Sequence, residues 1–126
     1  MTEIWKNIPG YEALYEVSNL GVVRAKTRVV PYGRHGQTTY AARILKQFKS
    51  NKYLSVKLSN QGKTTTKYTH HIVLLAFQGS RPHTIERGEI RHLNGDKEDN
   101  RLANLAYGTV KENAADRVRH KAGVGK

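Results

Sequence analysis

The chain has 126 residues, a hydrophobic fraction of 37% and a formal net charge of +12 at pH 7. This length allows one domain, or two small lobes that share a core. Because there is no cysteine, disulfides and thiolate zinc sites are excluded. The longest apolar run, residues 72–77, is far too short to span a membrane, and the N-terminus lacks a signal-peptide core, so we expect a soluble intracellular protein without a membrane partner.

Turn residues punctuate the N-terminal third and predict a small β-rich lobe. Pro9-Gly10 and Ser18-Asn19 are typical of turns, and the spacing of Tyr15 and Val17 favours a strand or hairpin. Residues 26–40 contain several proline and glycine breakers. We therefore expect a loop there, whose arginines and threonines suit phosphate contact.

A hairpin and a buried helix are predicted next. Residues 52–58 alternate between apolar and polar types, and residues 63–69 are typical of the return strand after a turn at 60–62. Residues 71–77 favour a short buried helix that Gly79 ends.

The most informative segment runs from Ile90 to Asn113. It predicts a strand over 89–93, a long polar loop, a second short strand, and a helix that Thr109 caps and that ends near residue 121. A nuclease of the ββα-metal type needs this order of elements. It requires a histidine as base, an amide that shapes the loop, and a helix residue facing a divalent metal.

His92 is the candidate base, because it follows a strand and its neutral imidazole can take a proton from water. A single histidine in a polar loop is more often a surface residue, but the spacing to Asn104 and Asn113 favours the catalytic interpretation. Asn104 lies between two leucines, so its amide should bond to loop backbone groups, since a buried unpaired amide is costly. Asn100 is a candidate for a similar loop bond.

The predicted helix carries the candidate metal ligands. Asn113, Asp116 and His120 share one face, and the oxygen atoms of Asn113 and Asp116 suit a hard cation such as Mg²⁺ or Mn²⁺. The alternative is an ordinary polar helix face. The loop carboxylates are expected to cap turns rather than bind metal; they are Asp96, Glu98 and Asp99.

The charge is unevenly placed, because no acidic residue lies between Glu16 and Glu86. A long surface of one sign indicates a polyanionic partner, which favours nucleic acid over a basic protein without a specific partner or a ribosome-associated one. The candidate nucleic-acid contacts are Arg24, Lys26, Arg28, Arg43, Lys46, Lys49, Lys52 and Arg91.

Two stretches resemble a known family. R-H-L-N-G-D-K-E-D-N-R-L-A-N-L-A-Y-G-T-V-K-E-N, residues 91–113, resembles the HNH homing endonucleases of phages and phage introns. W-K-N-I-P-G-Y-E-A-L-Y-E-V-S-N-L-G-V-V-R, residues 5–24, is similar to the modular domain that accompanies those nucleases on the N-terminal side. The resemblance implies an α+β fold, with a modular region over 1–50 and an HNH nuclease domain over 51–126. The ββα-metal core of that domain would span about residues 89–121.

The same resemblance implies a metal-dependent endonuclease that nicks or cleaves double-stranded DNA with Mg or Mn, as a monomer or homodimer. His92 would be the general base, Asn104 the loop-stabilising residue and Asn113 a metal ligand. His70 falls where the family often has a histidine, and a structural role, a DNA contact and a catalytic role all stay open for it. If the protein is phage-encoded, we expect it in the cytoplasm of a bacterial host.

Arg91 departs from the family pattern, since many members have Asp, Asn or His before the base and complete the metal site with it. A guanidinium cannot ligate a cation, so either fewer protein ligands hold the metal, or Asp116 or His120 substitutes, or the enzyme is impaired. Arg91 can instead clamp the scissile phosphate. The rival interpretation is a non-catalytic DNA-binding protein with a degenerate metal site. The interpretation as an RNA-binding or RNA-cleaving module is weaker, because the few Phe and Trp residues offer few rings on which bases could stack.

Overall fold

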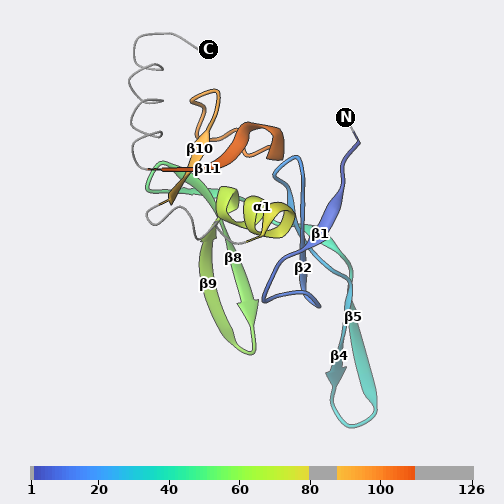
Figure 1. Cartoon of the computed structure of the whole chain (residues 1–126). Helices are drawn as coiled ribbons and strands as arrows, with labels where there is room; N and C mark the ends of the chain where they lie inside the picture. The colour runs from blue at the N-terminus through green and yellow to red at the C-terminus, as the bar shows by residue number, and fades with distance from the viewer. Residues whose placement is uncertain (1, 80–87, 110–126) are drawn as a thin grey trace.

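The computed structural model describes residues 2–79 and 88–109 (Figure 1). The helix predicted after Thr109, with Asn113, Asp116 and His120, lies outside the described residues. No helix within the described ranges has the length and apolar character that a membrane crossing needs.

The N-terminal part is a small antiparallel sheet in the order β1-β2-β3-β6. Its strands are β1 (Trp5–Asn7), β2 (Tyr15–Ser18), β3 (Val23–Ala25) and β6 (Arg43–Ile44). Tyr15 and Val17 of β2 are buried while Glu16 between them is half-buried, as the two-residue period of a strand requires. This confirms the strand predicted around these residues.

Residues 26–40 form a hairpin, so the prediction of a loop was wrong. Strands β4 (Arg28–Tyr32) and β5 (Gly36–Tyr40) pair only with each other among the described residues, and the hairpin extends away from the body (Figure 1). Valine and tyrosine on β4, and threonine and tyrosine on β5, favour β structure and outweigh the breakers. Pro31 is tolerated because both strands are edge strands, whose outward-facing backbone groups need no partner on a neighbouring strand.

The predicted central hairpin and helix are both present. Strands β7 (Phe48–Ser50), β8 (Tyr53–Asn60) and β9 (Lys63–Tyr68) form a three-stranded sheet, with Gln61–Gly62 as the turn between β8 and β9. Helix α1 (Thr69–Gln78) follows directly, ends before Gly79, and buries Ile72, Val73 and Leu74.

The last described elements are β10 (Gly88–His92), the 3₁₀ turn η1 (Leu102–Asn104) and β11 (Leu105–Thr109). Helix α1 lies at the centre of the molecule, in contact with β1 and β2, with β8 and β9, and with β11 (Figure 1). One buried cluster joins Val17 of β2, Leu58 of β8, Val73 of α1 and Leu105 of β11. The fold is α+β, and its N-terminal and C-terminal parts share a core.

Candidate active site

The β10–β11 hairpin brings the first two predicted site residues together. His92 is paired with Leu105, the residue that follows Asn104. The N–H of Leu93 also donates to the backbone carbonyl of Asn104 at 2.8 Å. The antiparallel register therefore places the end of β10 beside Asn104, although a long loop separates them in the sequence.

The Asn104 side chain holds that loop in shape. Its Oδ1 accepts the backbone N–H of Asn94 at 2.9 Å, and its Nδ2 donates to Asn94 Oδ1 at 2.9 Å and to the Asp99 carbonyl at 2.8 Å. Asn104 is buried, so these bonds satisfy an amide that would otherwise destabilise the fold. The amide bonds to loop groups, as expected, and not to the His92 ring.

Asp96 and Asp99 bond within the loop, whereas Glu98 forms an ion pair with Lys49 of β7. Asp99 accepts two bonds from the Arg101 guanidinium, at 2.8 and 2.7 Å, and one from Asn94 Nδ2 at 2.8 Å. The Arg101 bonds lower the pKa of Asp99 to about 2. Asp96 Oδ1 accepts the backbone N–H of Glu98 at 2.9 Å, a turn-capping bond. These side chains shape the loop rather than gather around a cation.

His92 is buried, with 8% of its surface exposed, and its Nε2 lies 2.8 Å from Asn100 Oδ1. With the amide oxygen as acceptor, Nε2 carries the proton and Nδ1 has the free lone pair. Burial lowers the pKa of His92, although the Asn100 bond and the charges of Asp96 and Asp99 oppose this shift. The imidazole is therefore neutral at neutral pH and able to accept a proton.

Asn100 is the site residue whose role the sequence did not reveal. We expected a loop bond, and the structure instead gives it the His92 imidazole as partner. Its backbone is held by the N-terminal part: the Leu102 N–H donates to the Asn19 carbonyl at 2.8 Å, and a Cβ on Gly21 would lie 2.9 Å from the Asn100 carbonyl oxygen. His92 and Asn100 are only eight residues apart, but no sequence signal predicts that their side chains meet, because the position of Asn100 depends on contacts between its loop and the N-terminal part.

Arg91 lies on the other face of β10 from the base. Successive strand residues point to opposite faces, and both Ile90 and His92 face the interior. The aliphatic part of the Arg91 side chain lies against Gly108, where a Cβ would overlap its Cγ and Cδ atoms. Gly108 is thus required for Arg91 to lie along the hairpin.

No group of three potential metal-binding side chains (His, Cys, Asp or Glu) occurs within residues 2–79 and 88–109. The predicted ligands Asn113 and Asp116 lie outside these ranges, so their role stays a prediction.

The predicted nucleic-acid contacts separate into two groups. Arg24 forms an ion pair with Glu16 at 2.9 Å and lies over the Trp5 ring, while Lys26 donates to Asn7 Oδ1 at 2.6 Å and to the Glu12 carbonyl. Both cations therefore have partners within the N-terminal part.

The other predicted cations are exposed, except for the half-buried Arg91. Lys49 pairs with Glu98 at 3.1 Å, whereas the side chains of Arg43, Lys46 and Lys52 are exposed and form no ion pair in the described part of the chain. A pair this exposed contributes little to stability and can exchange its anion for a phosphate. We therefore regard these four, rather than Arg24 and Lys26, as the better candidates for backbone contact.

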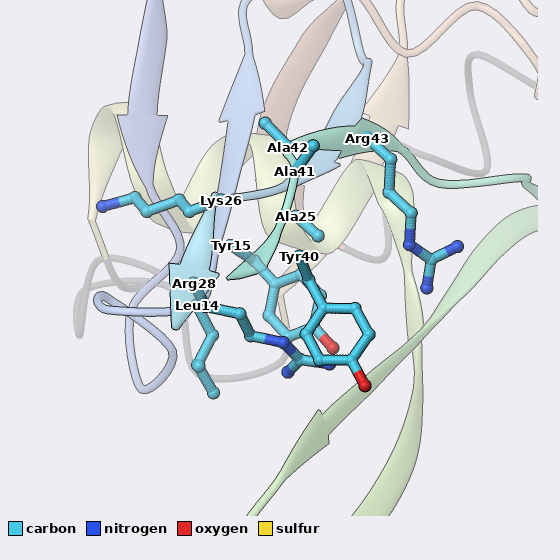
Figure 2. A pocket seen from close by; sticks show the side chains of 9 residues that line it. All are labelled: Leu14, Tyr15, Ala25, Lys26, Arg28, Tyr40, Ala41, Ala42 and Arg43. Atoms are coloured by element: carbon cyan, nitrogen blue, oxygen red, sulfur yellow. The ribbon is translucent and has the colours of Figure 1, made fainter. Parts of the chain in front are cut away.

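A hollow of about 530 Å³ separates the base of the β4–β5 hairpin from β2 and β3. Figure 2 shows Lys26, Arg28 and Arg43 around it, with the Arg28 guanidinium over the Tyr40 ring at 5.4 Å. The lining of this hollow is therefore basic, and it includes the exposed ring of Tyr40.

The end of β10 thus presents an imidazole bonded to the amide of Asn100, beside a loop that the amide of Asn104 shapes. Residues 3–59 match the NUMOD4 motif, and residues 67–115 match the HNH endonuclease family. The chain belongs to the HNH endonuclease family and carries a NUMOD4 motif on the N-terminal side.

The similarity to two known proteins covers nearly the whole chain. An uncharacterized HNH endonuclease of Acanthamoeba polyphaga mimivirus is 33% identical over 120 residues, which cover 93% of this chain and 26% of that protein. The solved structure of the HNH homing endonuclease I-HmuI, described for DNA binding and cleavage, matches with a TM-score of 0.71 and 28% identity. That match covers 94% of this chain and 59% of the other, so the chain spans only part of either relative.

Proposed function

We propose that this chain is a metal-dependent endonuclease that hydrolyses phosphodiester bonds in double-stranded DNA, in the manner of a phage-type homing endonuclease. The observation that carries the proposal is the buried His92–Asn100 pair at the end of the β10–β11 hairpin. The bond leaves Nδ1 as the basic nitrogen, and the Asn104 bonds hold the loop beside it. The likeness to a structure described for DNA binding and cleavage supports the same conclusion.

In this mechanism His92 Nδ1 takes a proton from water as the water oxygen forms a bond to phosphorus. The bond between phosphorus and the 3′ oxygen breaks, and its electron pair stays on that oxygen. Asn100 holds the Nε2 proton while Nδ1 becomes protonated, so it stabilises the imidazolium that forms. A monomer with one such site cuts one strand per binding event.

Bound Mg²⁺ or Mn²⁺ would stabilise the charge on the phosphate and on the leaving oxygen. Asn113 and Asp116 have the oxygen atoms that such hard cations prefer. Among the described carboxylates, Asp99 is committed to Arg101 and Asp96 to the loop backbone, so neither fits that role in this geometry.

Double-stranded DNA is the proposed partner. The exposed cations Arg43, Lys46 and Lys52 form no ion pair among the described residues, so phosphates can neutralise them at little cost. The β4–β5 hairpin adds Arg28 at the edge of the basic hollow. A two-stranded ribbon has the dimensions to reach into a DNA groove.

Arg91 favours a second candidate function, a DNA-binding protein without catalysis, because a cation replaces a residue that completes the metal site in many family members. Supercoiled plasmid incubated with Mg²⁺, Mn²⁺ or EDTA separates the two. Nicking that requires metal and is lost in His92→Ala supports the endonuclease. A gel shift without cleavage, in every metal, would leave only the binding function.

A further inference from the structure

The His92 ring is enclosed by aromatic rings from outside its own hairpin. Tyr53, the first residue of β8, lies nearly parallel to it, with centroids 6.0 Å apart and an interplanar angle of 20°. His70, in the first turn of α1, meets the same ring at 67° with centroids 5.2 Å apart. Tyr53 and His70 also contact each other at 4.9 Å. Two mutually supporting rings therefore bound the imidazole from two directions.

His70 is itself fixed in place. It is 7% exposed, and Tyr68 stacks on it with centroids 5.3 Å apart and an angle of 20°. These contacts follow from the chain path, because α1 begins directly after β9, and β9 pairs Tyr68 with Ser55 of β8. The topology thus brings the start of β8 and the start of α1 to the end of β10.

Among the described residues, no hydrogen bond of the Nδ1 atom explains a histidine at position 70. Its Nδ1 is enclosed and has no hydrogen-bond partner among the described residues. A buried polar atom without a partner is destabilising, so His70 interacts with the site through its ring rather than through that nitrogen. Burial, together with the nearby His92, lowers the pKa of His70 to about 3. The ring therefore adds no charge beside His92 when His92 takes up a proton.

We propose that His70 and Tyr53 are positioning residues that hold the His92 ring in the orientation where Nε2 meets the Asn100 amide oxygen and Nδ1 remains the base. A single hydrogen bond fixes one atom of the imidazole and leaves its plane free to turn about that bond. The parallel Tyr53 ring restricts that rotation, and the angled His70 ring restricts displacement of the imidazole toward α1. The inference rests on the proposed role of His92 as general base and deepens it.

The test compares His70→Ala, which removes the ring, with His70→Phe, which keeps a ring of similar shape without nitrogen. His71→Ala is the matched control, because His71 is exposed on the same helix turn and its ring contacts Tyr68 and His70 rather than His92. For each protein, ¹⁵N NMR reports which nitrogen of His92 carries the proton, and DNA affinity and the cleavage rate at saturating DNA are measured separately.

We expect His70→Ala to move His92 from the single Nε2-protonated form to a mixture of both forms. Its cleavage rate should fall by about ten- to a hundredfold, because small misplacements of a reacting group are costly. DNA affinity should stay unchanged, and His70→Phe should keep the His92 spectrum and a rate within about threefold of the parent protein.

A His92 tautomer unchanged in a folded His70→Ala protein would overturn the proposal. So would a His70→Phe protein as impaired as His70→Ala, since the nitrogen and not the ring would then matter. Melting curves show whether His70→Ala folds. If it does not, the comparison of His70→Phe with the parent protein decides whether a ring without nitrogen is sufficient to position His92. Because the NMR measurement needs no cleavage, it tests the positioning role even if the parent protein proves inactive.

Discussion

The amide oxygen of Asn100 lies 2.8 Å from Nε2 of His92, and both residues are buried. The contact joins a strand end to a loop position whose backbone is held by the turn at Gly21. The N-terminal part of the chain therefore supports the residue that orients the base, so the two family segments meet at the site.

Replacing Asn100 should impair the chemistry more than DNA binding. Asn100→Ala removes the acceptor for Nε2–H, so His92 loses its preferred tautomer and the cleavage rate should fall by about ten- to a hundredfold. Asn100→Asp supplies a charged acceptor that favours imidazolium, so the acid limb of the pH–rate profile should move to higher pH. Single-turnover rates across pH measure both effects. Equal profiles for the parent and the Asp variant would argue against this contact.

His92→Ala should abolish cleavage and leave DNA affinity nearly intact, because a neutral base stabilises the transition state and contributes little to ground-state binding. Since burial lowers the pKa of His92 below its usual 6.5, the parent rate should reach half its maximum below pH 6.5 on the acid side. A rate for the Ala variant within a few-fold of the parent would remove His92 from the mechanism.

The affinity for DNA should fall steeply with salt, with a log–log slope of about −0.9 per phosphate neutralised. Lys46→Glu and Lys52→Glu should each reduce the magnitude of that slope by about 0.9, which is the contribution of one phosphate contact. Lys63→Glu makes the same charge change at the opposite end of the β8–β9 hairpin from Lys52 and should affect the slope less. Titrations at several salt concentrations give the slopes, and a salt-independent affinity would show that this surface is not the DNA footprint.

Arg91→Asp tests why the chain departs from its family at this position. If a ligand is missing, a carboxylate before His92 should bring half-maximal cleavage to a lower concentration of Mg²⁺ or Mn²⁺. If Arg91 clamps the scissile phosphate, its loss removes a charge-assisted bond worth roughly 1.5–3 kcal/mol, and the rate should fall at every metal concentration.

Arg91→Ala is the control for that titration, because it removes the guanidinium and its packing on Gly108 without adding a ligand. A lower rate in both variants, with no gain in apparent metal affinity for Asp over Ala, would contradict the missing-ligand explanation.

Acid should destabilise the fold partly through His70. Its pKa is about 3 in the folded protein and 6.5 in the reference state, so the unfolded chain binds the extra proton. The stability is thus complete above pH 6.5 and decreases by up to about 1.4 kcal/mol per pH unit as the pH falls toward the folded value. His70→Phe should flatten the dependence of unfolding free energy on pH between about pH 7 and about pH 5.

Denaturant unfolding at each pH measures this difference. Asp99 does not interfere, because its pKa of about 2 confines its contribution to more acidic conditions, below its usual 3.8. An identical pH dependence in the parent and the Phe variant would mean that His70 is not protected from protonation.

Local patterns in the sequence were sufficient for several elements. Alternation of apolar residues predicted β8, the turn after it predicted the return strand β9, and the apolar run before Gly79 predicted α1, because side-chain period and turn chemistry act over a few residues. The order of a strand, a loop and a second strand around His92 and Asn104 was likewise predictable. The β4–β5 hairpin was not, since its breakers concealed a β preference that both strands share.

Only the tertiary structure decided which side chains meet. Asn100 bonds to His92, and the rings of Tyr53 and His70 contact the His92 ring. Arg24 and Lys26 bond to groups within the N-terminal part. Each of these contacts joins residues from different elements. Their geometry depends on how the sheets pack around α1, and a contact that packing creates leaves no periodic signal in the sequence.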